Sequence, residues 1–348
     1  MKSSFLFAFS IVTVVSQASL AQTTDSYQVP RTEYGQPDLQ GVWNFSSNIP
    51  MTRPSQYGNQ EFLTPEQIEE VKARNAAAAT AADAAAAKLV LNPEAPEASD
   101  NPGGYNDFWI ESAGIGDVVR TSLIVYPENG QLPEAREGAQ LQRGGLGPDI
   151  PSTRPVRYVV GGIAKDGPED RGLSERCIVG FNSGPPFTPS LYNNNVQIFQ
   201  NKDTAVIMTE MIHDARIVPI GEKPALSDDI RLWSGDSRGW WEGDSLVVET
   251  KNFNGMRQSF GSRGHNFEAV LTEKFTRTSY DNVDYEFTVD DPETFTDKFT
   301  AIVPMTKVAG QLYEYACHEG NYGMTNLLRG MRVEEGMVIE GATTSNAR

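Results

Sequence analysis

Alternating apolar and polar residues dominate the second half of the chain. Between residues 282 and 290 the alternation is strict, and its apolar members are Val283, Tyr285, Phe287 and Val289. Because successive side chains of a strand point to opposite faces, this pattern predicts a strand with one buried and one solvated face. Similar runs joined by short turns predict further strands at 196–200, 204–212, 240–241, 246–250, 269–277, 299–303 and 311–317. The pattern indicates a mostly β domain, folded as an antiparallel barrel or sandwich.

The first half of the chain has a different pattern. Residues 38–44 and 118–126 are expected to form strands, with Trp43 as a core anchor. Thr64, Pro65 and Gln67 form a capping box that opens a helix running to about Leu91. Its apolar stripe is thin, so we expect a surface helix.

Glycine-rich and proline-rich segments suggest how the domain is organised. Residues 92–104 are expected to be a loop, and residues 134–175 a long excursion with few regular elements. We predict a single domain over residues 22–348, in which residues 60–180 form a helix and loop insertion.

The N-terminus resembles an export signal. An apolar run at residues 5–15 follows Lys2 and is too short to span a membrane. The small residues Ser19 and Ala21 suit a signal peptidase, so residues 1–21 are expected to be a signal peptide that is cleaved after Ala21. The predicted location is periplasmic or secreted, without stable membrane insertion.

Composition narrows the choice of partners. The chain carries 46 acidic and 29 basic side chains, a formal net charge of −17. Such a charge disfavours nucleic-acid binding, which depends on Lys and Arg. The expected partner is a small-molecule ligand or substrate, and no cofactor is expected.

Two cysteines are too few for a disulfide-dense scaffold. In an oxidising compartment Cys177 and Cys317 could form a disulfide, and the alternative is two buried thiols.

Three clusters could carry chemistry. In the first, Glu210 ends an apolar row on the predicted strand 204–211, so desolvation would raise its pKa and suit it to acid–base work. His213 and Arg216 follow at the exit of this strand. The structural alternative is a charged turn in which Arg216 pairs with Glu210 or Asp214.

The second cluster contains Asp236, Arg238 and Trp240, followed by Trp241, Glu242 and Asp244. Carboxylates beside a guanidinium and indole rings could bind a flat or sugar-like ligand. The structural alternative makes Glu242–Asp244 a hairpin turn and Asp236–Arg238 an ion pair.

The third cluster, His318, Glu319 and Asn321, follows the predicted strand 311–317. A histidine beside a carboxylate can act as an acid or base near neutral pH, although a structural role is the alternative. Glu210, His213, His318 and Glu319 could supply metal ligands, but no helical His-Glu-x-x-His or Cys-x-x-Cys arrangement occurs, so no metal is expected.

Four motifs together resemble a large family of secreted bacterial proteins of unassigned activity: PDLQGVW (37–43), EMIHDAR (210–216), GDSRGWWEGD (235–244) and CHEGN (317–321). This resemblance covers most of the chain and implies no particular reaction. A weaker resemblance is to lipocalin-like (calycin) barrels, whose first strand carries Gly-x-Trp, as Gly41–Trp43 does here. It implies that an arginine near the end of the chain, Arg329 or Arg332, packs on Trp43.

The residues support two functional hypotheses. The first is an exported enzyme that performs acid–base chemistry, of isomerase, lyase or hydrolase type, on a small organic molecule in a barrel-end pocket. Its catalytic residues would be Glu210, His213 and His318, and its substrate-binding residues Arg216, Asp236, Arg238, Trp240 and Glu319. The second is a non-catalytic, lipocalin-like protein that binds a small apolar ligand.

Overall fold

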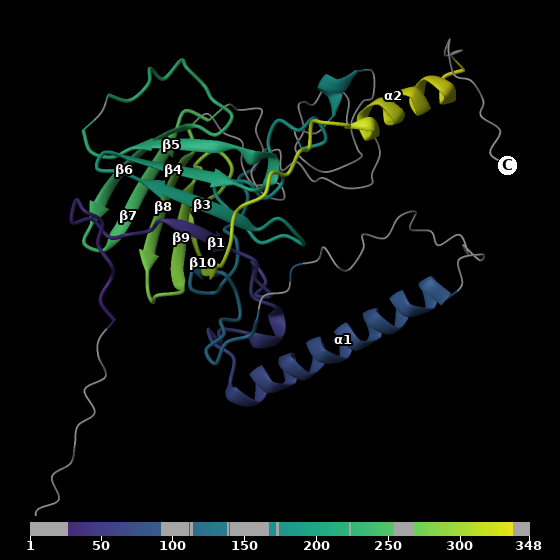
Figure 1. The fold of residues 1–348 in the computed structure, drawn as a ribbon, viewed down its shortest axis with the longest axis horizontal. Coiled ribbons are helices and arrows are strands. Elements are labelled where there is room, and N and C mark those ends of the chain that lie inside the picture. Colours follow the sequence, from purple (N-terminus) through teal and green to yellow (C-terminus); the bar gives the residue numbers. More distant parts are fainter. Residues whose placement is uncertain are drawn as a thin grey trace, which may run out of the picture.

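A computed structural model of the chain describes residues 27–91, 111, 114–137, 139, 167–171, 174–222, 224–253 and 268–336. The expected signal peptide, the loop 92–104 and most of the excursion 134–175 lie outside these residues. Figure 1 shows a strongly curved sheet from which two helices, α1 (Pro65–Leu91) and α2 (Tyr322–Glu334), extend to one side. The protein is mostly β, as the alternation of its sequence predicts.

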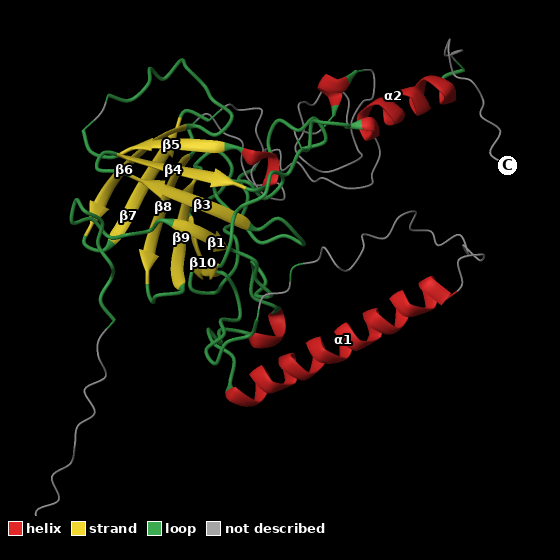
Figure 2. Cartoon of the chain, in the orientation of Figure 1, coloured by secondary structure: helices red, strands yellow, loops and turns green. Residues whose placement is uncertain are grey.

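Ten strands form one antiparallel sheet (Figure 2). They are β1 (Gly41–Asn44), β2 (Ile124–Tyr126), β3 (Asn195–Gln200), β4 (Thr204–Thr209), β5 (Ala215–Pro219), β6 (Asp236–Glu242), β7 (Ser245–Lys251), β8 (Val270–Arg277), β9 (Asn282–Asp290) and β10 (Phe299–Val308). Their order is β5-β4-β3-β1-β10-β9-β8-β7-β6, and β2 pairs with β10. Short 3-10 helices lie at Ser55–Tyr57, Pro168–Asp170 and Met211–His213.

The two edge strands of this sheet, β5 and β6, almost close it into a barrel. Ile220 forms a parallel bridge with Gly239, and the Gly221 N–H donates to the Gly239 carbonyl over 2.8 Å. A Cβ atom on Gly239 would lie 3.0 Å from Val218 Cγ1, so the missing side chain permits this close approach. Elsewhere along the described strands the seam between β5 and β6 carries no ladder, and the barrel stays open there.

Alternate residues of most strands fill the interior of the barrel with apolar side chains, whereas the buried positions of β6 are Ser237 and Gly239. The largest fully buried ones on the strands are Trp43, Phe275, Tyr285 and Phe287, and Phe45 and Phe187 join them from outside the strands. Burying this much apolar surface is the main stabilising contribution to such a fold. The interior is therefore a packed core along these strands.

Trp43 packs against an arginine, but this arginine is neither of the two that the sequence predicts. Its indole N–H donates to the Leu39 carbonyl over 2.8 Å, and the Arg277 guanidinium lies 5.5 Å from its ring centroid. The expectation that Arg329 or Arg332 packs on Trp43 is wrong, because both belong to α2. The register places Arg277 at the end of β8, where its side chain turns back over the first strand.

Three expected strands differ in the structure. Of residues 118–126 only β2 joins the sheet, although Arg120 forms an isolated bridge with Phe62, and residues 311–317 form an irregular segment instead of a strand. The run 204–212 ends at Thr209, and the chain then reverses through the 3-10 helix at 211–213 into β5, which the sequence pattern does not predict.

The start of α1 confirms the capping box. Thr64 Oγ1 accepts the Gln67 N–H over 3.3 Å, and Gln67 Oε1 accepts the Thr64 N–H over 2.8 Å. Most side chains of the described first half of the helix are exposed, as its thin apolar stripe predicts.

The segment between β1 and β3 leaves the sheet and returns to it. β1 pairs directly with β3 in an antiparallel register, Asn44 opposite Asn195, although about 150 residues separate them in the chain. This excursion contains α1, and within it β2 returns to pair with β10.

A disulfide between Cys177 and Cys317 joins the excursion to the segment that precedes α2. Asn321 reinforces this junction, because its Nδ2 donates to the Glu175 carbonyl over 2.8 Å and its Oδ1 caps α2 by accepting the Met324 N–H. The helix itself contains no buried residue. Within the described part of the chain, none of the helices has the length and apolar character needed to cross a membrane.

Candidate functional site

Glu210 follows the last residue of β4, on the outer side of the barrel wall. Its side chain is half-buried, and its Oε2 accepts a hydrogen bond from Asn195 Nδ2 over 2.8 Å. Burial raises the pKa of Glu210 above its ordinary value, hydrogen bonds from Asn195 and Asn193 oppose this shift, and the nearby Glu111 carboxylate adds to it. The direction that the sequence predicts for this pKa is confirmed.

Glu111, which the sequence reading did not single out, is the carboxylate next to Glu210. Its Oε2 accepts hydrogen bonds from Asn44 Nδ2 and Asn194 Nδ2, both over 2.9 Å, and its Oε1 accepts the Asn194 N–H over 3.2 Å. Three donors on two strand ends therefore fix the orientation of this carboxylate.

Two asparagines connect the carboxylates. Asn44 Nδ2 donates to Glu111 and also to Asn195 Oδ1 over 2.9 Å, and Asn195 Nδ2 donates to Glu210. The result is a continuous chain of side-chain hydrogen bonds, Glu111–Asn44–Asn195–Glu210, across the paired ends of β1 and β3. A change in the charge of one carboxylate can therefore alter the electrostatic environment of the other through these hydrogen bonds.

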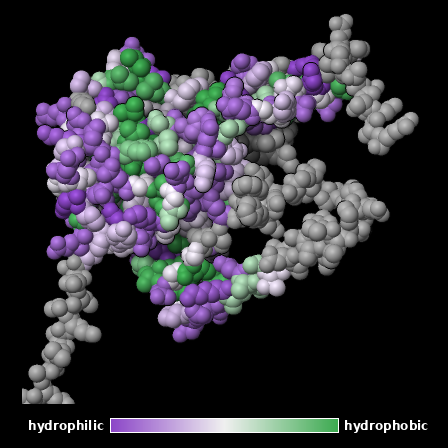
Figure 3. All heavy atoms as spheres, in the orientation of Figure 1, coloured by the Kyte–Doolittle hydropathy of each residue, from purple (hydrophilic) through white to green (hydrophobic). Residues whose placement is uncertain are grey.

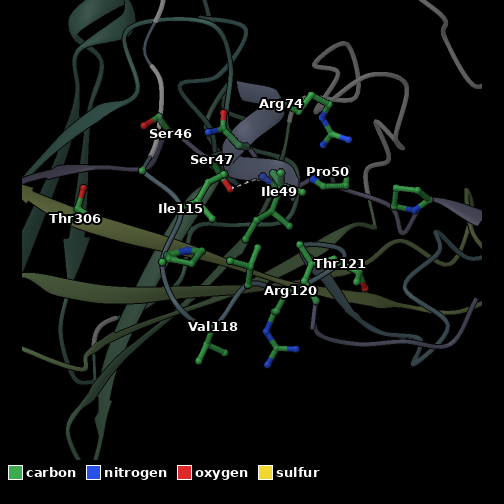
Figure 4. Close-up of a pocket in the computed structure, with 18 of the residues that line it drawn as sticks. Ser46, Ser47, Ile49, Pro50, Arg74, Ile115, Val118, Arg120, Thr121 and Thr306 are labelled. Carbon is green, nitrogen blue, oxygen red and sulfur yellow. Dashed lines mark hydrogen bonds between the residues drawn. The ribbon is translucent and has the colours of Figure 1, made fainter. Parts of the chain in front are cut away.

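A cavity of about 780 Å³ opens beside Glu111, between the outer face of β9 and β10 and the excursion (Figure 4). This volume lies within the range of about 300–1,000 Å³ that is typical of small-molecule sites. Its wall comes from the end of β1, residues 46–57, the first turns of α1 and residues 114–121. The wall residues of the charged types, Arg, Lys, Asp and Glu, are Arg74, Glu111 and Arg120.

None of the predicted catalytic and binding residues is part of this cavity wall. Glu210 lies behind it, one asparagine away from Asn44, which does line the cavity. The described cavity is therefore outside the barrel, not the barrel-end pocket that the sequence reading expects.

The two described histidines lie outside the cavity wall. His213 is exposed, with its Nδ1 atom 3.3 Å from the Tyr315 carbonyl oxygen and 3.9 Å from Glu314 Oε1. His318 and Glu319 are exposed in the segment that follows. The structure thus brings His213 next to the segment that carries His318, and places both on the surface. The third histidine, His265, lies outside the described residues.

Arg216 points into the barrel from β5 and pairs with Glu273 of β8. Arg216 Nη2 lies 2.9 Å from Glu273 Oε1, Arg216 Nη1 binds Glu273 Oε2, and both residues are buried. The expected pairing of Arg216 with Glu210 or Asp214 is wrong, because β5 turns this side chain inward. Burial acts to lower the pKa of Arg216, but the Glu273 carboxylate outweighs it and the pKa is raised.

Tyr285 completes this buried network. Its hydroxyl donates to Glu273 Oε1 over 2.8 Å and accepts the Phe187 N–H over 3.1 Å. Burial raises the pKa of Tyr285 well above its ordinary value, and the Glu273 carboxylate raises it further. The donors and acceptors of this network are matched to one another, and none of its residues lines the cavity beside Glu111. We interpret the network as structural.

Asp236, Arg238 and Trp240 lie on the outer face of β6, away from Arg216. Arg238 Nη1 pairs with Asp236 Oδ1 over 2.6 Å, and Arg238 Nη2 donates to the Pro224 carbonyl over 2.7 Å. Trp240 donates its indole N–H to Glu242 Oε1 over 2.7 Å, just before the tight turn into β7. The structural alternative for this cluster, an ion pair beside a hairpin turn, is confirmed.

No group of three or more His, Cys, Asp or Glu side chains that could hold a metal occurs among the described residues. No protein-family model matches the sequence, and no curated protein matches it either.

Proposed function

We propose that the protein binds a small organic molecule in the cavity beside Glu111. One observation carries this proposal: a cavity of ligand size holds a carboxylate whose orientation is already fixed by Asn44 and Asn194. A preoriented polar group in a partly apolar wall is typical of small-molecule sites, since little entropy is lost when the ligand binds.

We further propose that this site works outside the cytoplasm. The apolar run at 5–15, the small residues before position 22 and the Cys177–Cys317 disulfide support export to an oxidising compartment. N-terminal sequencing of the exported protein tests this, and an intact Met1 on the mature chain would contradict it.

A fragment screen by ligand-observed NMR, followed by titration of the hits, tests the binding proposal. Glu111→Gln keeps the shape of the side chain but removes its charge, so it should weaken cavity ligands by about tenfold, the loss of one charge-assisted hydrogen bond. Glu128→Gln is the matched control, because Glu128 is an exposed carboxylate outside the cavity wall. Equal affinity for hits in both variants would refute the proposed site.

A second candidate, acid–base catalysis, is favoured by the link between the two carboxylates. Glu111 would exchange the proton with the substrate, and Glu210, with its raised pKa, would tune Glu111 through Asn44 and Asn195. In this form of the proposal His213 and His318 have no part in proton transfer, because they lie outside the cavity wall.

Turnover of the hits distinguishes the candidates. If the protein is an enzyme, Glu111→Gln should abolish turnover, while Glu210→Gln should leave turnover detectable and shift its pH profile. If hits bind but none is converted, the protein is a binding protein.

A further inference from the structure

We infer that the ligand of this cavity is bipolar: a small organic acid with an apolar body whose other end carries an amino or hydroxyl group. This inference rests on the proposed function and specifies the ligand class of the same site. The Glu111 carboxylate would receive the amino or hydroxyl group, and Arg74 and Arg120 would attract the acidic group.

The carboxylate end of the site favours a hydrogen-bond donor. Glu111 Oε2 already accepts two hydrogen bonds, whereas Oε1 accepts one from the described residues, the Asn194 N–H. A carboxylate oxygen can accept two, so Oε1 keeps room for a donor from the ligand. An ionised carboxylate cannot donate, which excludes a second acceptor such as a ligand carboxylate at this position.

The arginine side of the site favours an anion. Arg120 is anchored, because its Nη1 binds Glu61 and its guanidinium lies 4.6 Å from the ring centroid of Phe62. Arg74, on α1, forms no ion pair with any residue that the structure describes. A guanidinium has five N–H donors, so both arginines retain donors for an acidic group.

The charge of the cavity wall contrasts with that of the whole chain. The protein has a formal net charge of −17, yet the wall contains two arginines and one glutamate. Glu61 pairs with Arg120, so Arg74 is the wall arginine that has no ion pair among the described residues. In a strongly acidic protein such an arginine is a local attraction point for an anion.

The middle of the site is apolar. In Figure 4, Ile49 lies near the centre of the view, with Arg74 above it, Arg120 below it and Ser46 to one side. Further apolar side chains line the same cavity: Leu63, Val71, Ile115, Val118 and Val119. Between its polar groups the wall therefore suits an aliphatic or aromatic body, whose burial contributes about 25 cal/mol per Å².

Isothermal titration calorimetry of the full mature chain with three matched series of probes tests the proposed ligand class. The series are ω-hydroxyalkanoates of increasing chain length, the alkanoates that lack the hydroxyl group, and the ω-hydroxyalkanamides that lack the charge. The hydroxyalkanoates should bind best at one chain length. Removal of either end group should weaken binding by about tenfold, the loss of one charge-assisted hydrogen bond.

Variants assign the two ends. In Glu111→Gln the advantage given by the hydroxyl group should fall, because a neutral amide oxygen accepts a weaker hydrogen bond than a carboxylate does. In Arg74→Gln with Arg120→Gln the acid should lose its advantage over the amide. Arg329→Gln, on the exposed helix α2, is the matched control. If Arg74 and Arg120 do not bind the acidic group of the ligand, the acid and amide series will bind equally to the wild-type protein. That result would overturn the inference.

The outcomes separate this inference from the proposed function. Neutral apolar probes that bind in the cavity as tightly as the hydroxyalkanoates would refute the bipolar class and leave the binding site intact. Failure of every probe to bind, together with failure of the fragment screen, would refute both.

Discussion

The Arg216 guanidinium and the Glu273 carboxylate meet inside the barrel, with 2.9 Å between Arg216 Nη2 and Glu273 Oε1. Arg216 belongs to the edge strand β5, and Glu273 belongs to β8, far from β5 in the order of the sheet. Among the described residues, β5 and β6 are bridged only at Ile220 and Gly239. The ion pair therefore adds a second link from β5 across the open seam, in this case to β8.

Arg216→Met should destabilise the protein by about 3–5 kcal/mol, because it leaves the buried Glu273 carboxylate without its partner. The double variant Arg216→Met with Glu273→Met should recover much of this loss, since it removes both charges. Urea unfolding followed by tryptophan fluorescence measures the three free energies. A single variant as stable as the wild type would contradict a stabilising connection at the seam.

Arg277→Ala should destabilise the protein by about 2–4 kcal/mol, because part-buried backbone carbonyls lose their donor and the packing of the guanidinium on Trp43 is lost. Arg277 donates to the carbonyls of Asp38 and Tyr280, both over 2.8 Å, and its guanidinium also covers the Trp43 ring. Arg329→Ala should change stability by less than about 0.5 kcal/mol, since it is a surface substitution. Thermal unfolding compares them, and equal melting temperatures would remove the role given to Arg277.

Glu210 should make stability depend on pH in a defined direction. Its pKa is raised in the folded protein, so its contribution to stability is fully present below the pKa of the unfolded chain and is lost as the pH rises through the folded value. Glu210→Gln should therefore gain stability relative to the wild type at about pH 7 and lose this advantage at about pH 4.

Urea titrations at the two pH values measure this difference, with Glu128→Gln as the exposed control. Because Asp284 also has a pKa raised by burial, only the difference between variants isolates Glu210. An advantage of Glu210→Gln that grows toward low pH would have the wrong sign.

Loss of the disulfide should loosen one segment more than the barrel. A disulfide closing 140 residues could contribute about 4–5 kcal/mol in the chain-entropy argument, but α2 has no buried residue and few contacts depend on it. Cys177→Ser with Cys317→Ser should accelerate tryptic cleavage after Arg329 and Arg332 severalfold. The same double variant should lower the free energy of barrel unfolding by less than the about 4–5 kcal/mol of the chain-entropy argument. Unchanged cleavage would show that other contacts hold the segment.

Local patterns predict much of the fold. The capping box at Thr64 and the hairpins around residues 201–203 and 243–244 depend on neighbouring residues, so their sequence signals are reliable. β5 is not predicted because its five residues end in a proline and follow a tight reversal. Without β5, the inward direction of Arg216 cannot be deduced.

The site is harder to predict because its contacts are long-range. Glu111 gains its role from Asn44 and Asn194, which lie 67 and 83 residues away in the chain. A weak signal was present in the run Asn193–Asn195, whose amides suit buried polar networks. Glu273 gave a clearer sequence signal for a buried polar network, because it is a charged residue at an inward position between Leu271 and Phe275 on a predicted strand.

The direct pairing of β1 with β3 separates the wall of the ligand site from the framework that supports it. The two ends of the excursion leave the barrel side by side, so its length can change without shifting the register between β1 and β3. One side of the cavity is barrel wall, and the other is built from this excursion. A grafted excursion of different sequence could thus give the same barrel a new ligand preference, as exchanged loops do on an antibody framework.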